Sequence, residues 1–97
     1  MSGLLPIVEL LADCKTDAER AQWLLSVPQG VIYRDHVAIR AVLRKAQFAL
    51  GVECLELEFA AINATRSPHG ELPHAVVLGL QAVRSFLRDV VRKGGLS

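Results

Sequence analysis

The stretch from Pro73 to Lys93 reads PHAVVLGLQAVRSFLRDVVRK, and its apolar residues recur with the period of an α-helix. Spacings of four, three, four and three place one apolar stripe on one face of that helix: Val76, Leu80, Val83, Leu87 and Val90. Proline suits the first helical position, and two cations followed by two glycines favour a helix end after Lys93. So regular a stripe must be buried against other helices, and we expect Leu80, Val83 and Leu87 to be nearly fully buried.

The rest of the chain shows three further helical patterns, which we expect over residues 1–14, 16–27 and 36–50. The second of these begins with Thr16-Asp17-Ala18-Glu19, a capping box in which the Thr16 hydroxyl accepts from the Glu19 N–H. We expect residues 28–34 to form a loop and Asp35 to cap the helix that follows. Short connections between helices predict an all-α fold, a compact bundle of four to five helices, as a single domain over residues 1–97.

Residues 52–65 fit two kinds of secondary structure. The run Leu55-Glu56-Leu57-Glu58-Phe59 alternates like a half-buried strand. The same segment also places one apolar set on a single helical face: Val52, Leu55, Phe59 and Ile62. We expect a helix, because the chain offers no second strand with which an isolated strand could pair.

Composition and charge exclude several classes of protein. The chain has 97 residues, 52% of them hydrophobic, and a net charge of +1 from 11 basic and 10 acidic residues. Nothing in this balance draws the protein to nucleic acid or anionic lipid. No apolar run approaches the roughly 20 residues that span a bilayer, and we expect no membrane association and no signal peptide. Cys14 and Cys54 lie in apolar helical contexts, which indicates reduced thiols in a cytoplasmic protein.

The sequence contains no motif that carries chemistry. It lacks a Gly-rich phosphate loop, a nucleophile elbow and a CxxC pair. His69, Glu71 and His74 lie within six residues, but a metal site needs further ligands and no cysteine stands at a related spacing. We therefore expect an exposed polar loop there, no cofactor, no bound metal and no enzymatic activity.

Residues 46–63 read AQFALGVECLELEFAAIN, and this segment resembles the helix-turn-helix of small phage-type repressors around Leu50-Gly51-Val52. The resemblance implies a DNA-binding transcriptional regulator, which is the alternative function. The second helix would present glutamates to the DNA, at positions 53, 56 and 58, where recognition helices carry basic or amide side chains. If DNA is bound, the expected footprint is the basic face formed by Arg84, Arg88, Arg92 and Lys93, which otherwise reads as a solvated face with local salt bridges.

Apolar residues outside the main stripes predict an interface between chains. The helix over residues 36–50 has a second, narrower stripe, and Leu57 points away from the stripe of its own helix; the expected interface is Val37, Ala41, Phe48 and Leu57. A symmetric homodimer would bury this patch, with Arg40 and Arg44 meeting Glu53 or Glu56 across its rim. The alternative is a monomer in which the last helix covers Phe48. The leading function is a small non-enzymatic regulatory or adaptor protein that binds another protein.

Overall fold

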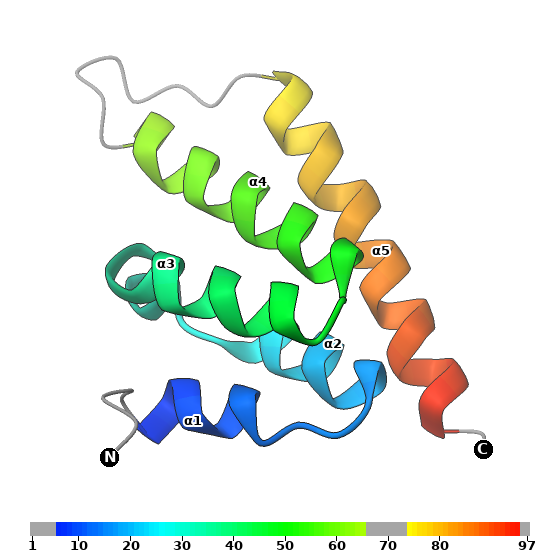
Figure 1. Ribbon diagram of the computed structural model, residues 1–97. Coiled ribbons are helices and arrows are strands. Elements are labelled where there is room, and N and C mark those ends of the chain that lie inside the picture. Colours follow the sequence, from blue (N-terminus) through cyan, green and yellow to red (C-terminus); the bar gives the residue numbers. More distant parts are fainter. Residues whose placement is uncertain (1–5, 66–73, 96–97) are drawn as a thin grey trace.

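The computed structural model describes residues 6–65 and 74–95, and within them the chain forms five helices and no strand (Figure 1). The helices are α1 (Pro6–Ala12), α2 (Asp17–Ser26), α3 (Gln29–Lys45), α4 (Ala49–Thr65) and α5 (His74–Gly95). The prediction of an all-α bundle of four to five helices is confirmed. The alternating run around Leu57 is part of α4, so the helical interpretation of residues 52–65 is confirmed as well.

Helix α4 holds the bundle together, because it packs against α2, α3 and α5. Figure 1 shows α5 crossing the bundle, with its N-terminal half beside α4 and its C-terminal half beside α2. The buried core draws on all five helices: Val8, Leu11, Ala21, Leu24, Ile32, Ile39, Leu43, Phe48, Cys54, Leu55, Ile62, Val83 and Leu87. Val83 and Leu87 are buried as predicted, but Leu80, in the half of α5 that lies beside α4, is only half-buried.

Helix α3 begins earlier and ends earlier than the sequence pattern predicts. The expected loop over residues 28–34 is wrong, because the chain is helical from Gln29 and places Ile32 in the core at 2% exposure. Asp35 has non-helical angles, φ −114° and ψ 19°, and lies at a kink inside α3 where two helical segments meet, so the predicted boundary at Asp35 survives as this kink. Burial of Ile32 outweighs the strand preference of the residues beside it.

The turn between α3 and α4 closes on a residue in the left-handed conformation. Gln47 has φ 58°, its N–H donates to the Arg44 carbonyl at 3.0 Å, and the Phe48 N–H donates to the Leu43 carbonyl at 3.0 Å. These two bonds form a Schellman motif, which ends a helix and brings the following apolar residue back onto it. The motif turns Phe48 into the core, where it is 5% exposed.

Two glycines permit close packing inside helices. Gly51 lies within α4, and a Cβ there would be 2.6 Å from the Phe48 ring. Gly94 lies within α5, and a Cβ there would be 2.2 Å from the Cβ of Ala18 on α2. At both positions another part of the chain occupies the space that a side chain would need. The sequence predicts a helix end after Lys93, whereas α5 continues to Gly95.

The hydrogen bond predicted for the capping box at the start of α2 is present. Thr16 has extended φ and ψ angles of −128° and 158°, and the Glu19 N–H donates to its hydroxyl at 3.2 Å. The Glu19 carboxylate lies beside the Thr16 hydroxyl, which donates to it at 3.4 Å. The cap therefore fixes where α2 begins, as the sequence predicts.

Candidate interaction surfaces

The predicted interface residues do not form one patch. Phe48 is buried within the chain, and the prediction that it lies on the surface is wrong, because the turn at Gln47 directs it inward. Leu57 is half-buried and packs over Gly79 of α5, where its Cδ2 would be 3.3 Å from an added Cβ. Val37 is 64% exposed and Ala41 is also exposed on α3. Two of the four predicted residues therefore remain on the surface.

An aromatic cluster lies beside Val37 and joins α3 to α4. The ring centroids of Tyr33 and Phe59 are 6.1 Å apart, and those of His36 and Phe59 are 3.9 Å apart, with both pairs stacked. The Nδ1 atom of His36 is buried and has no hydrogen-bond partner among the residues that the structure describes. These contacts make His36 a packing residue of the α3–α4 contact.

No group of three or more metal-ligating side chains occurs within residues 6–65 and 74–95. Of the predicted polar cluster, His74 lies exposed at the start of α5, and His69 and Glu71 lie outside the described residues. The expectation about that cluster stays a prediction.

The basic residues of α5 are not equivalent. Arg84 is paired with Glu58 of α4, and Arg92 is paired with Asp89 one turn earlier on α5. Arg88 and Lys93 are exposed, and neither forms an ion pair with a residue in the described ranges. Consecutive helical residues are about 100° apart, so Lys93 lies well off the line of the three arginines. Of the predicted basic face, Arg84 and Arg92 are thus held in ion pairs. Arg88 and Lys93 have no ion-pair partner among the described residues and lie on different sides of α5.

Ion pairs connect α4 to both of its longer neighbours. Glu56 accepts a hydrogen bond from Nε of Arg40 on α3, so the contact predicted to cross a dimer interface lies within one chain. Glu58 on the other side of α4 accepts from Nε of Arg84 at 2.8 Å. Glu53 remains exposed on α4, with no ion-pair partner in the part of the chain that the structure describes.

The segment that resembles a helix-turn-helix has its turn at a different place. Leu50-Gly51-Val52 lies inside α4, and the chain reverses at residues 46–48. The exposed edge of α4 consists of Ala49, Glu53, Glu56, Ala60 and Asn63. This edge carries two carboxylates and no cation, whereas a helix that enters the major groove works beside phosphates.

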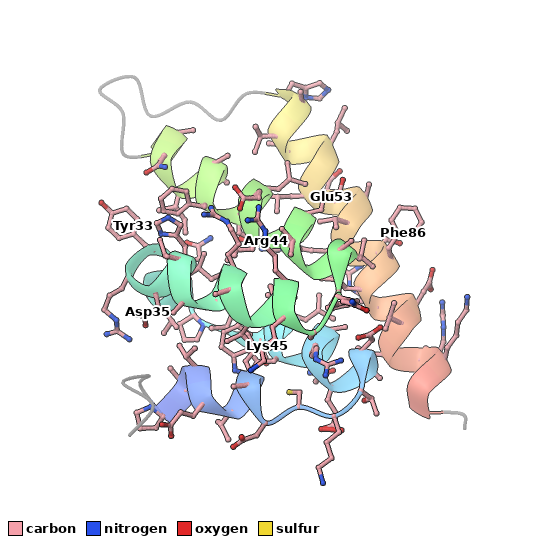
Figure 2. The ribbon with its side chains drawn as sticks, in the orientation of Figure 1. Tyr33, Asp35, Arg44, Lys45, Glu53 and Phe86 are labelled. Carbon is pink, nitrogen blue, oxygen red and sulfur yellow. The ribbon has the colours of Figure 1, made fainter. Side chains whose placement is uncertain are left out.

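A second apolar stripe on α5 is exposed, and the sequence interpretation missed it. Leu78 is 51% exposed, Phe86 is 58% exposed, and Ala82 lies exposed between them. Figure 2 shows the Phe86 ring pointing away from the body of the bundle. The spacing of four residues was readable in the sequence, but the longer buried stripe of the same helix concealed it. We call the α5 outer face the exposed side formed by these three residues with Lys93, which continues the stripe, and Arg88, which flanks it; neither cation has an ion-pair partner among the described residues.

A shallow surface pocket of about 400 Å³ lies at the α3–α4 turn, lined by Arg44, Gln47, Phe48, Ala49 and Val52. Its described lining contains one cation and otherwise uncharged side chains. An acid–base pair or a nucleophile is what hydrolytic or transfer chemistry requires, and none of these five residues supplies one. The pocket can accept an apolar group, and Arg44 can approach a negative charge beside it.

The two cysteines are free thiols with weak acidity. Burial, with the nearby Glu58 carboxylate as a smaller cause, raises the pKa of Cys54 from its ordinary value of 9.0 to about 12. Burial also raises the pKa of Cys14, and Glu19 adds to that shift. A raised pKa lowers the fraction of thiolate, which makes each cysteine a weaker nucleophile.

Comparison with known proteins adds no relative: no family model, no curated protein and no solved structure matches the chain. Among the described residues, none of the helices combines the length and apolar character needed to cross a membrane. A function is therefore inferred from the surface of the described residues.

Proposed function

We propose that this chain is a small non-enzymatic regulatory or adaptor protein that binds another protein through the α5 outer face. The observation that carries the proposal is the exposure of Leu78 and Phe86, at 51% and 58%, on a helix whose opposite face is packed into the core. Large apolar side chains that share one exposed face are typical of binding surfaces. Free thiols at Cys14 and Cys54 fit the reducing cytoplasm as the place of action.

The α5 outer face differs from other exposed apolar residues of the chain. Leu10 on α1 is 63% exposed, but it is a single leucine, and scattered apolar residues on a surface need no explanation. Phe86 and Leu78 lie on the same side of one helix and are separated only by the small side chain of Ala82. An aromatic and an aliphatic anchor at this spacing are what a partner helix needs.

Self-association stays a prediction, and two exposed surfaces of the chain are candidates for the contact. Val37 and Ala41 are exposed on α3, but Phe48 and Leu57 are engaged within the chain, so the two exposed residues form a smaller patch than predicted. A homodimer would use either that patch or the α5 outer face. Crosslinks between two copies of the chain would identify the dimer and its location.

The test is site-specific photocrosslinking in the cells that produce the protein. A photoreactive amino acid replaces Phe86 in one variant and Leu10 in the matched control, because both positions are exposed and apolar. We expect a protein adduct from position 86 that position 10 does not give and that persists after nuclease treatment. Failure to obtain a protein adduct at position 86, or an adduct that nuclease removes, would overturn the proposal, and the second result would favour the DNA-binding alternative.

A further inference from the structure

The charges of the bundle are segregated by helix. Helix α4 contains three glutamates and no lysine or arginine, whereas α5 contains four basic residues and the single carboxylate of Asp89. Glu58 takes up Arg84, and Asp89 is held by Arg92. Of the charged groups on α5, only cations are left without an ion pair among the residues described. The α5 outer face is therefore apolar with an uncompensated positive charge.

The spacing of the exposed apolar residues on α5 suits contact with a partner helix better than contact with a flat surface. Leu78 and Phe86 are eight residues apart, which is about 12 Å along the helix axis. Ala82 lies midway, so a small side chain separates two large ones, and a ridge on a second helix can pack between such side chains. A membrane surface requires a broad apolar face with many large residues, and here there are two.

The unpaired cations lie at one end of this stripe. Lys93 follows Phe86 by seven residues, about two turns, and so lies on nearly the same side of α5. Arg88 lies about 80° around the helix from Leu78 and about 160° from Phe86, so it flanks the stripe on the side away from Phe86. Asp89, which is held by Arg92, lies between Phe86 and Lys93 on the same side of α5. An occupant of the stripe would therefore meet apolar anchors along its length, then this ion pair, and then the positive charge of Lys93.

We infer that the occupant of the α5 outer face is an amphipathic helix of another protein with acidic residues beside its apolar stripe. This inference rests on the proposed function and names the chemical class of the partner. A second copy of α5 fits less well, because it would bring its own unpaired Arg88 and Lys93 and no free carboxylate. Carboxylates on a partner helix would pair with these two cations and fix the direction in which the helix lies.

The experiment selects binders from a displayed library of amphipathic helical segments whose net charge varies from basic to acidic. The whole chain is the bait, and the double variant Leu78→Ser/Phe86→Ser is the counter-selection, with Leu10→Ser as the matched control for loss of an exposed leucine. We expect acidic sequences to be enriched, with binding at least about tenfold weaker to the double variant and unchanged for Leu10→Ser. The variant Arg88→Glu/Lys93→Glu should remove the preference for acidic sequences while Leu78 and Phe86 still anchor the segment.

The inference would be overturned if the selected segments showed no excess of acidic residues. It would also be overturned if they bound the Leu78→Ser/Phe86→Ser variant as well as they bind the unchanged chain. Co-sedimentation with phosphatidylserine vesicles, but not phosphatidylcholine vesicles, that depends on Phe86 would overturn it as well, because the occupant would then be a lipid surface. Photocrosslinking at position 86 separates this failure from failure of the proposed function. If position 86 gives a protein adduct but the selected binders show no preference for acidic residues, the proposed function stands and only the chemical class of the partner is wrong.

Discussion

Glu58 on α4 accepts hydrogen bonds from both Nε and Nη2 of Arg84 on α5, and the two side chains differ in exposure. The Glu58 side chain is 4% exposed and that of Arg84 is 43% exposed. A buried carboxylate without its partner keeps a large desolvation penalty, whereas a half-exposed guanidinium can turn to water. Loss of Arg84 should therefore lower stability more than loss of Glu58.

Removal of Arg84 and removal of Glu58 should lower the free energy of unfolding by unequal amounts. Arg84→Met leaves the Glu58 charge buried, and we expect a loss of about 3 kcal/mol in the free energy of unfolding. Glu58→Met leaves a guanidinium that can reach solvent, and the loss should stay below about 1 kcal/mol. Urea denaturation of both variants measures the difference, and Arg88→Met is the control because Arg88 is exposed and forms no ion pair with a described residue.

The double variant Glu58→Met/Arg84→Met should recover most of the stability lost in Arg84→Met, because two apolar side chains can replace a buried pair. Equal losses in the two single variants would contradict the argument, since they would mean that the enclosure of Glu58 carries no energetic weight.

Gln47 should be a site where glycine stabilises the protein. Its φ of 58° is costly for a residue with a Cβ, and glycine adopts it freely at this position of a Schellman motif. We expect Gln47→Gly to raise the free energy of unfolding by about 0.5–1 kcal/mol. The matched control is Gln81→Gly in the exposed middle of α5, which should lower stability by about 1 kcal/mol. Loss of stability in both variants would mean that the left-handed turn is not formed.

The sequence predicts the helices well and their ends poorly. Periodic apolar residues are a strong signal because the core must be contiguous, so four helical segments were recognisable from spacing alone. The turn at Gln47 was not, because a left-handed glutamine carries no compositional signal, and the predicted helix over residues 36–50 runs on to Gly51, four residues beyond Gln47. Misplacing this turn also led to the wrong interpretation of Phe48 as a surface residue.

The candidate surface was harder to predict than the fold. Leu78, Ala82 and Phe86 have helical spacing, but so do the residues of the buried stripe on the same helix, and spacing does not say which stripe is covered. The ion pairs between helices were equally difficult to predict from the sequence. Arg84 and Glu58 are 26 positions apart, and only the packing of α4 on α5 brings them together.

Two leucines on α5 provide a direct measure of which stripe is buried. Leu87 is fully buried and Leu78 is 51% exposed. We expect Leu87→Ala to lower the free energy of unfolding by about 2–5 kcal/mol, because it leaves a cavity in the core. Leu78→Ala should change it by no more than about 0.5 kcal/mol. Thermal and urea unfolding of the two variants give the comparison, and a large loss for Leu78→Ala would show that this side of α5 is covered in the folded protein.

The last prediction concerns alkaline pH and the thiol of Cys54. Its pKa is raised to about 12 in the folded chain, above the ordinary value of 9.0 that applies once the chain unfolds. Between these two values the folded state holds a proton that the unfolded state has lost, so stability falls as the pH rises. The contribution is complete below pH 9.0 and is lost progressively toward about pH 12. The slope from this one group can reach about 1.4 kcal/mol per pH unit. Urea denaturation at a series of pH values measures it, with Cys54→Ala as the variant that should flatten the curve and Cys14→Ala as the matched control. If wild type and Cys54→Ala lose stability in parallel above pH 9.0, another group titrates and Cys54 is not the cause.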